Sequence, residues 1–288
     1  MRARAAIASA VLALAPMLLL AGCSESAPDS TREPAVTLPN AGARFDYQLG
    51  GPYPPPDGAS IIVRDRLADP AGNGYDVCYV NGFQTQPDES AEFALQHPEL
   101  VLHVPGSLSS SKGRGEPLVD PGWPDEYLLD ASTEAKRTAL AGIVGRWIRG
   151  CRDAGYAAVE IDNLDSFTRS EGLLTEKDNL ALAAEYARIA HDAGLAIAQK
   201  NTAESAEHLA ELGYDFAVTE SCRHFDECGA YASVYDVVLD IEYADELGVD
   251  GFVEACTEPV PGVTMILRDH DLRMPGEDGY LHQACPAE

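Results

Sequence analysis

Apolar runs of strand length alternate with segments of helical periodicity through the second half of the chain. One helical segment places Leu140, Ile143, Val144 and Trp147 on a single face and ends at Gly155. Strand-like runs follow it at residues 157–163, 195–201, 215–220, 237–243 and 263–268. Strands separated by helices in this way predict a parallel sheet.

The first half of the chain adds three strand-like runs, at residues 43–51, 60–65 and 75–80. Residues 84–126 are irregular and rich in Pro, Gly and Ser, which predicts a long loop region that shapes a binding surface. About eight strands in roughly 250 residues favour a single-domain α/β fold, the (β/α)8 TIM barrel, over an open doubly wound sheet. No glycine-rich phosphate loop follows a strand, which argues against a nucleotide site.

The stretch AAVEIDNLDSF at residues 157–167 combines a short buried strand with an unusual density of acids. Glu160, Asp162, Asn163 and Asp165 lie at its end, where burial of a core gives no reason for them. In α/β barrels the carboxyl ends of the strands build the active site. We therefore take Asp162 as the centre of the chemistry, with Asn163 beside it as a substrate-binding candidate.

Polar side chains close most of the other predicted strands as well. A single strand-end acid more often caps a helix or faces solvent, but a series of them around one barrel mouth favours a site for a polyhydroxylated ligand. The series is Asp65, Tyr79, Asp130, Asp162, Lys200, Glu220, Glu242 and Arg268. Two carboxylates across such a mouth are the usual means of breaking a glycosidic bond.

Asp162 and Glu220 are the candidate catalytic pair, and Lys200 lies on the strand between them. A neighbouring ammonium group would keep Asp162 ionised. The apolar run 216–218 before Glu220 predicts a raised pKa, as a general acid requires. Lys200 could equally form a purely structural ion pair with either acid.

The first 22 residues have the layout of a secretory signal, and the small residues Leu20-Ala21-Gly22 before Cys23 are typical of bacterial lipoprotein processing. We expect a signal peptide at 1–22, a lipidated Cys23 with a flexible tether over 23–42, and the barrel over 43–288. The protein would be exported and anchored to the bacterial membrane by lipid alone, facing outward. The alternative is an ordinary signal peptide with a chance cysteine.

The formal net charge is −27, and removal of residues 1–22, which contain Arg2 and Arg4 but no acid, changes it to −29. Such a surface repels nucleic acid and attracts cationic polymers. Solubility alone is the other explanation. We expect a monomer that binds a polysaccharide and needs no cofactor.

Six cysteines follow Cys23, and an even number in an exported chain favours disulfides over free thiols. The favoured pairs are Cys222–Cys228, Cys256–Cys285 and Cys78–Cys151. Zinc held by Cys222, His224 and Cys228 is a weak alternative, because their spacing fits no common ligand pattern. We expect no metal.

The motifs AVEIDNLDSF, GLAIAQKNTAE, DFAVTESC and DIEY, in this order, resemble those of glycoside hydrolase family 114, the endo-α-1,4-polygalactosaminidases and their relatives. YDVCYVNGFQTQPDE, DEYLLDA and FDYQLGG are also similar to that family. The resemblance implies a (β/α)8 barrel that hydrolyses α-linked galactosamine polymers. Its catalytic pair falls on Asp162 and Glu220.

Two other functions remain open at this point. The chain could be a non-catalytic carbohydrate-binding lipoprotein, although that class usually has two open α/β lobes. It could also be a barrel glycosidase that acts on neutral α-galactosides. Asp162 and Glu220 end strands two apart in the predicted order, which favours retention of configuration with Asp162 as nucleophile.

Overall fold

Eight parallel strands follow one another in chain order, and a short ninth strand pairs antiparallel with the eighth. The computed structural model describes residues 36–104 and 115–286. The strands are β1 Phe45–Gln48, β2 Ile61–Asp65, β3 Tyr75–Asn81, β4 Ala158–Asp162, β5 Ala196–Lys200, β6 Phe216–Glu220, β7 Val238–Tyr243, β8 Val263–Arg268 and β9 His282–Ala284. The predicted parallel α/β sheet is therefore confirmed.

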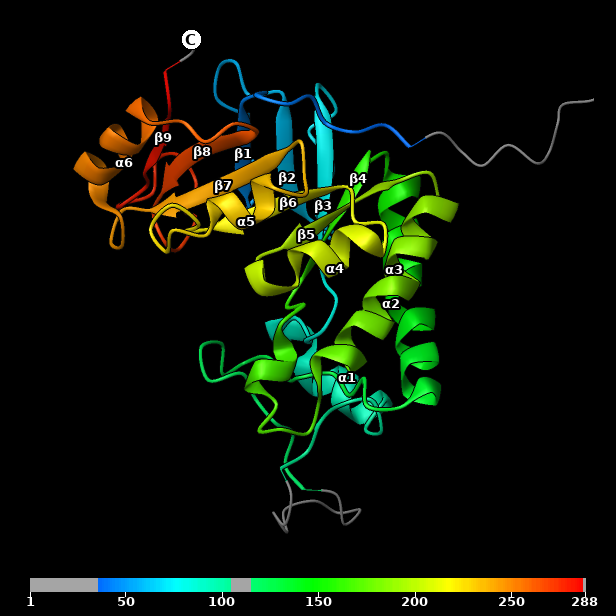
Figure 1. Ribbon diagram of the computed structural model, residues 1–288. Helices are drawn as coiled ribbons and strands as arrows, with labels where there is room; N and C mark the ends of the chain where they lie inside the picture. Colours follow the sequence, from blue (N-terminus) through cyan, green and yellow to red (C-terminus); the bar gives the residue numbers. More distant parts are fainter. Residues whose placement is uncertain (1–35, 105–114, 287–288) are drawn as a thin grey trace, which may run out of the picture. The chain divides into compact units, whose positions relative to one another are not determined.

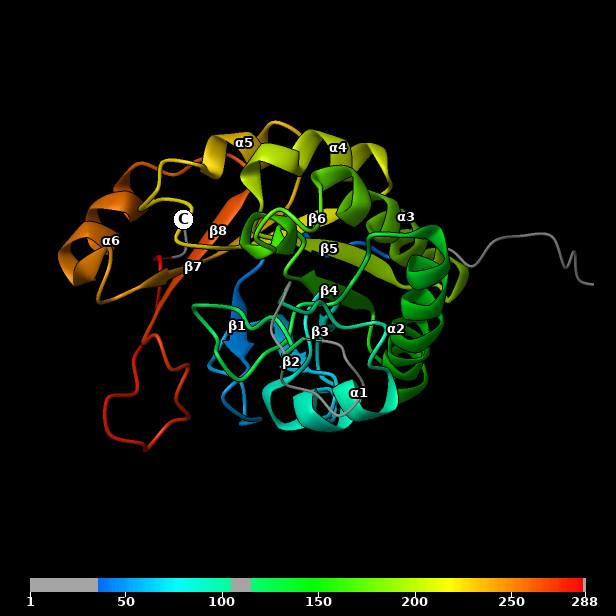
Figure 2. The ribbon, with the colours of Figure 1, turned by 90° about the horizontal axis from the view of Figure 1, so that it is seen from below.

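The helices are α1 Ser90–Gln96, α2 Glu134–Ala154, α3 Glu176–Asp192, α4 Ala206–Glu211, α5 Cys228–Ala232 and α6 Gly248–Thr257, with 3-10 turns η1 Pro87–Glu89, η2 Ser166–Arg169 and η3 Ala203–Ser205. Helices α2 to α6 lie along the outside of this curled sheet, whereas α1 belongs to the connection between β3 and α2 and lies below the strands in Figure 1 (Figures 1 and 2). The Thr133 side chain accepts a hydrogen bond from the Lys136 amide at the start of α2, and Gly155 ends it with φ of 105°. Both boundaries follow from the sequence.

The curl of the sheet brings its first and last parallel strands, β1 and β8, close together. Within the described residues no backbone ladder joins them, because β9 pairs with β8. The Arg268 guanidinium on β8 instead donates to the Tyr47 carbonyl on β1. The observed architecture is thus a curled nine-stranded sheet, where the sequence predicted a complete (β/α)8 barrel.

The first two crossovers also depart from strict β/α alternation. Residues 49–60 and 66–74, which connect β1 to β2 and β2 to β3, are described and contain no helix. The run Pro54-Pro55-Pro56 lies in the first of them, and proline cannot supply the amide donors that a helix interior requires. Helices cover the sheet only from α2 onward.

Strand periodicity divides the core into an inner and an outer part. Residues such as Phe45, Val63, Ala158, Val218 and Leu239 face the inside of the curl and are fully buried there. The alternate strand residues pack outward, and those of β3 to β6 pack against the helices. The inside is therefore a packed core, and a polar site can form only at its carboxyl-terminal end.

Three disulfides are present, with the pairings that the sequence favoured: Cys78–Cys151, Cys222–Cys228 and Cys256–Cys285. The first links β3 to α2, the second closes the loop after β6, and the third joins α6 to the segment after β9. Because the sulfur atoms of Cys222 and Cys228 bond each other, neither is available as a thiolate for zinc.

The predicted signal peptide at 1–22 and the lipidation site Cys23 lie outside the described residues, as does the tether up to residue 35. Within the described residues, no helix has the length and apolar character needed to cross a membrane.

Candidate active site

A cavity of about 730 Å³ opens at the carboxyl-terminal ends of the strands. This volume falls in the range of small-molecule binding sites. Asp162 of β4, Lys200 of β5 and Glu220 of β6 all line it. The inward side chains below Lys200 and Glu220 are the apolar Ala198 and Val218, whereas the buried acid Glu160 lies below Asp162 on β4.

Lys200 is the centre of the charge arrangement, with a side chain that is only 2% exposed. Its Nζ lies 3.3 Å from Glu160 Oε1, 4.0 Å from Asp162 Oδ2 and 3.3 Å from Glu220 Oε2. It also donates to the Tyr47 hydroxyl at 2.8 Å, and that hydroxyl donates to Glu160 at 2.9 Å. One buried cation thus faces three carboxylates.

The protonation of Lys200 follows from these neighbours. Burial acts to lower its pKa, but the negative charges of Asp162, Glu220 and Glu160 outweigh burial and raise the pKa well above its ordinary value. Lys200 is therefore a permanent cation. Glu160 behaves differently: burial raises its pKa to about 7, against the opposing effect of Lys200.

Asp162 is held in one orientation by a donor on each oxygen. The Tyr79 hydroxyl donates to Oδ2 at 2.7 Å, and the amide of Asn163 donates to Oδ1 at 2.7 Å. Its side chain is still 19% exposed, so it reaches the cavity. A carboxylate fixed in this way keeps an oxygen available for a ligand in the cavity.

Glu220 shows a pKa opposite to the one predicted from its apolar strand. Burial does act to raise the pKa, but the charge of Lys200 and hydrogen bonds from Tyr243 and Asn201 together lower it below the ordinary value. Asn201 Nδ2 donates to Glu220 Oε2 at 3.0 Å, and the Tyr243 hydroxyl donates to Oε1. The sequence expectation was wrong because these donors come from neighbouring strands.

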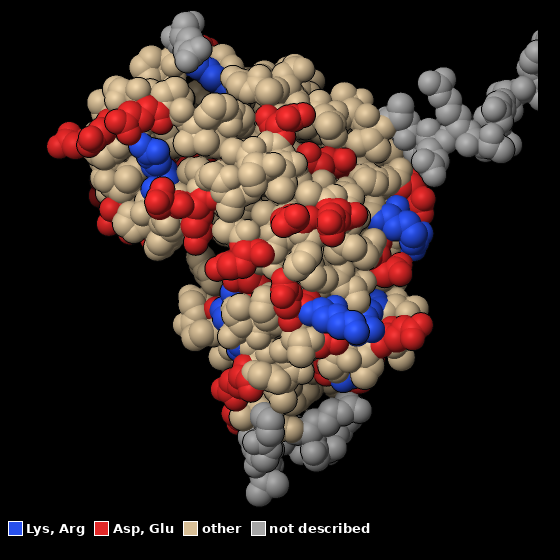
Figure 3. Space-filling view, viewed as in Figure 1, with Lys and Arg blue, Asp and Glu red and all other residues tan. Residues whose placement is uncertain are grey.

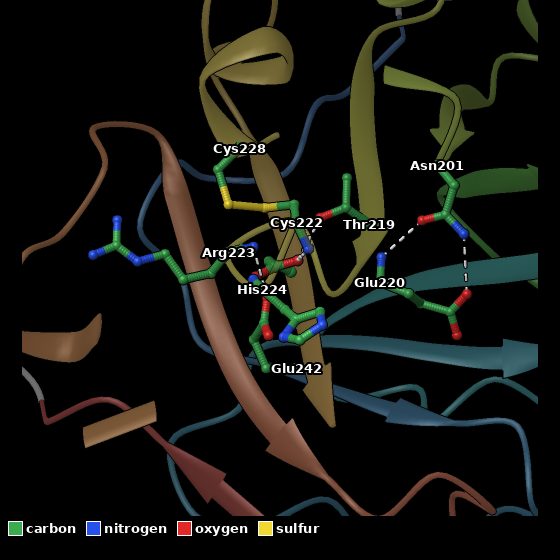
Figure 4. Close-up of a disulfide and its surroundings, with 9 residues drawn as sticks. Asn201, Thr219, Glu220, Cys222, Arg223, His224, Cys228 and Glu242 are labelled. Carbon is green, nitrogen blue, oxygen red and sulfur yellow. Dashed lines mark hydrogen bonds between the residues drawn. A yellow bond between two sulfur atoms is a disulfide. The ribbon is translucent and has the colours of Figure 1, made fainter. Parts of the chain in front are cut away.

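A left-handed residue follows each of these three strand ends. Asn163 has φ of 62°, Asn201 of 47° and Ser221 of 59°. Such values are uncommon outside glycine and cluster at functional sites. The turn at Asn201 lets its Oδ1 accept the Glu220 amide at 2.7 Å while its Nδ2 reaches the Glu220 carboxylate (Figure 4). The chain thus leaves the sheet abruptly after each functional residue.

Glu126 adds a further acid to the cavity, from the long loop between β3 and α2. It is 7% exposed and accepts a hydrogen bond from Asn81 Nδ2 at 2.8 Å. Burial raises its pKa to about 7, although the bond from Asn81 acts in the opposite direction. Asn81 Oδ1 in turn accepts from Asn163 at 3.0 Å, which links Glu126 to the end of β4.

The structure brings together Asp65, Tyr79, Asn163 and Lys200 with the candidate pair, since all line the same cavity. Asp65 lies near its edge, where its carboxylate accepts from Gln86 Nε2 at 2.7 Å and from the Leu67 amide at 2.8 Å.

Three other predicted site residues do not line this cavity. Asp130 lies before α2, where it accepts from Ser132 and Lys136. Arg268 is fully buried and donates to the carbonyls of Leu281 and Arg273. Both residues therefore make local contacts outside the cavity.

Glu242 faces away from the cavity because side chains alternate between the two faces of a strand. On β7 the inward residues are Leu239, Ile241 and Tyr243, so Glu242 points outward. Its carboxylate accepts the backbone amides of Arg223 at 2.7 Å and His224 at 3.3 Å, as Figure 4 shows. It holds the loop after β6.

Several residues that shape the site were not predicted from the sequence: Tyr47, Glu126, Asn201 and Tyr243. Asn201 directly follows Lys200 and Tyr243 directly follows Glu242, so strand-end position was an available signal for both. Tyr47 and Glu126 gave no such signal, because their contacts depend on strands or loops distant in sequence.

Acidic side chains outnumber basic ones in the lining of the cavity. On the face seen in Figure 3, acidic side chains are spread over the surface and outnumber basic ones, in line with the net charge of −27. A positively charged ligand would be attracted to such a surface.

The fold is similar to that of two solved structures. Ega3 of Aspergillus fumigatus, solved in complex with galactosamine, matches with a TM-score of 0.66 and 19% identity, over 87% of this chain and 98% of that one. The glycoside hydrolase domain of PelA from Pseudomonas aeruginosa matches with a TM-score of 0.53 and 15% identity, over 85% of this chain and 99% of that one.

No curated protein sequence matches this chain. The model of glycoside-hydrolase family GH114, in contrast, matches residues 25–288. That match covers the described strands and the whole cavity. This chain therefore belongs to glycoside-hydrolase family GH114 and is a glycosidase.

Proposed function

We propose that this protein is an exported, lipid-anchored hydrolase that cleaves α-1,4-linked galactosamine-containing polysaccharide with retention of configuration. Asp162 acts as the nucleophile and Glu220 as general acid, then base. The observation that carries the proposal is the position of both carboxylates within 4.0 Å of the Lys200 ammonium, at one end of a shared cavity.

The separation of the two carboxylates supports this assignment. Because Lys200 Nζ is 4.0 Å from Asp162 Oδ2 and 3.3 Å from Glu220 Oε2, these oxygens are at most about 7.3 Å apart. Retaining enzymes have carboxyl groups about 5–5.5 Å apart and inverting ones about 6.5–9.5 Å apart. This bound, which concerns the one oxygen of each group nearest Lys200, admits the retaining separation.

Retention then proceeds in two steps. An oxygen of Asp162 bonds to the anomeric carbon as the glycosidic C–O bond breaks, and Glu220 gives its proton to the departing oxygen. In the second step water attacks the same carbon, Glu220 takes the proton of that water, and the bond to Asp162 breaks. The lowered pKa of Glu220 suits its role as base in this second step.

The substrate class is supported by three observations. The family is GH114, a structural neighbour was solved with galactosamine, and the acidic chain complements a polymer with free amino groups. The lipid anchor rests on the sequence before Cys23 alone. We further propose that the curled sheet closes into a barrel through side chains such as Arg268, which joins β8 to β1.

Amide substitutions test the catalytic pair. Asp162→Asn and Glu220→Gln should each lower hydrolysis of purified galactosaminogalactan by at least about 1,000-fold, because each removes a group that takes part in bond breaking. Product analysis by chromatography is the measurement, with circular dichroism to show that the variants are folded. Asp130→Asn, the same change outside the cavity, should keep most of the activity. A folded variant at Asp162 or Glu220 with near-normal activity would remove that residue from the mechanism.

Salt dependence separates a cationic from a neutral substrate. Between roughly 0.05 and 0.5 M salt the Debye length falls from about 14 to about 4 Å. We expect kcat/KM on a deacetylated, cationic polymer to fall over this range, and kcat/KM on the fully acetylated polymer to stay nearly constant. An equal response of both polymers would assign the negative charge to solubility, and hydrolysis of neutral α-galactosides alone would identify a different glycosidase.

The pH profile tests Glu220 as the acid. Glu220 can donate only when protonated, and its lowered pKa means that the protonated fraction shrinks as pH rises. With a neutral, acetylated substrate, kcat/KM should therefore rise from about pH 7 to about pH 5. Tyr243→Phe removes a hydrogen bond that lowers this pKa, so the basic limb should move to higher pH. An unchanged limb in Tyr243→Phe means that another group supplies the proton.

Stereochemistry tests Asp162 as the nucleophile. Attack by Asp162 followed by attack of water on the same carbon gives two inversions, so the first-formed reducing end should be the α-anomer. Proton NMR during the first minutes of hydrolysis measures this before mutarotation. An initial β-product would show a single displacement by water and exclude a covalent intermediate on Asp162.

A further inference from the structure

Two exposed aromatic side chains line the catalytic cavity. Among the described residues eight large apolar side chains are exposed, and only two of these, Trp123 and Phe225, are aromatic. They are 60% and 59% exposed. They are also the only two of the eight that line the cavity. Because both rings are exposed in the lining of the cavity, a ligand bound there can pack against them.

We propose that Trp123 and Phe225 are stacking platforms for sugar rings on opposite sides of the catalytic pair, so that the cleft binds an internal stretch of an amino-sugar chain. This inference rests on the proposed function and deepens it: it assigns binding subsites beyond the reacting sugar and favours cleavage within the polymer. Neither residue takes part in bond breaking.

The chemistry of the ligand suits such platforms. A pyranose ring has an apolar C–H face that packs on an aromatic ring, and a hexosamine also carries an ammonium group that is attracted to the ring face, most strongly to that of Trp. Both interactions are available only to an aromatic side chain that keeps one face free.

Trp123 is held in place by the buried residue Asp120. Asp120 Oδ1 accepts the amides of Gly122 at 2.7 Å and Trp123 at 3.2 Å, while Oδ2 accepts from Gln84 at 2.6 Å and from Arg169 at 2.5 Å. Asp120 is 2% exposed. The indole therefore stands on a turn that is fixed before any ligand binds, which reduces the entropy lost on binding.

Phe225 stands on a second turn that is fixed in a different way. The disulfide Cys222–Cys228 closes the loop around it, and Glu242 accepts two backbone amides just before it (Figure 4). The Phe225 amide donates to the Ser221 carbonyl at 3.0 Å. The His224 ring packs edge-on against the phenyl ring, with centroids 4.7 Å apart. The outward position of Glu242 on β7 thus serves this loop.

The strand order places the two turns on opposite sides of the pair. The turn of Trp123 belongs to the connection after β3 and reaches Asn81 of that strand through Glu126. Phe225 belongs to the connection after β6. The strands β3, β4, β5 and β6 are neighbours in this order. Asp162 at the end of β4 and Glu220 at the end of β6 therefore belong to the part of the sheet that extends from the turn of Trp123 to the turn of Phe225. A chain that crosses the pair from one platform to the other has sugars on both sides of the cleaved bond.

The test compares long and short substrates in Trp123→Ala and Phe225→Ala. With a deacetylated galactosaminogalactan oligomer, each substitution should lower kcat/KM by about five- to tenfold, mainly through KM. With an aryl α-galactosaminide, which fills little beyond the catalytic subsite, the change should stay within about twofold. Trp123→Phe and Phe225→Tyr should restore most of the loss. Leu95→Ala, at an exposed apolar residue of α1 outside the cavity, is the matched control and should change neither value.

Binding without turnover separates this inference from the proposed function. In Asp162→Asn, calorimetric titration with the same oligomer should give a Kd that weakens by about five- to tenfold on adding Trp123→Ala or Phe225→Ala. If the oligomer binds and both additions leave Kd unchanged, or if both substrates lose activity equally, the platforms are wrong. If the wild type neither binds nor cleaves the oligomer, the proposed substrate is wrong as well.

Discussion

The ammonium group of Lys200 faces three carboxylates in a nearly water-free position, and the rest of the site depends on this arrangement. Its distances to Glu160, Asp162 and Glu220 are between 3.3 and 4.0 Å. Carboxylates so close together repel each other strongly when charge is poorly screened, so without a cation some of them would take up protons. Lys200 thus permits two ionisable acids to share one cavity. The largely apolar inner face of the sheet beneath it keeps water away from this cluster of charges.

Strands and loops have different roles around Lys200: the strands position the acids, and the loops position the residues that surround them. The strands fix the reacting acids, since hydrogen-bonded backbone on both sides leaves little freedom at β4, β5 and β6. The loops fix the surroundings, and each uses a buried acid as an anchor: Asp120 for the turn of Trp123 and Glu242 for the turn of Phe225. Burial of an acid is costly unless several donors satisfy it, and backbone amides of a tight turn provide such donors.

A family of glycosidases can vary its specificity through such loops without altering the reacting centre. The connection between β3 and α2 contributes Trp123, Glu126 and Asp120, while the connection after β6 contributes Phe225. Neither connection carries Asp162, Lys200 or Glu220. Under the proposed mechanism and the proposed stacking platforms, the strand ends break the glycosidic bond and the loops bind the sugars on either side of it.

Much of this could be predicted from the sequence, because it depends on local pattern. Strand positions followed from short apolar runs, α2 from its apolar face and end residues, and the placement of Asp162, Lys200 and Glu220 at one edge from the rule that parallel strands end together. The family resemblance used the same strand-end motifs, and the family match agrees with it.

Tertiary structure decided which face of the sheet each strand residue points to and which residues distant in the sequence contact it. Two alternate faces exist on every strand, and only packing showed that Tyr243 faces the cavity while Glu242 faces the loop after β6. The pKa of Glu220 is lowered by the charge of Lys200 and by hydrogen bonds from Tyr243 and Asn201, all of which lie on or directly after neighbouring strands. Whether β1 and β8 pair depends on β9 occupying the edge of β8. A sequence records which groups are available, but the direction of a side chain and its charge neighbours arise only when strands distant in the chain are packed against one another.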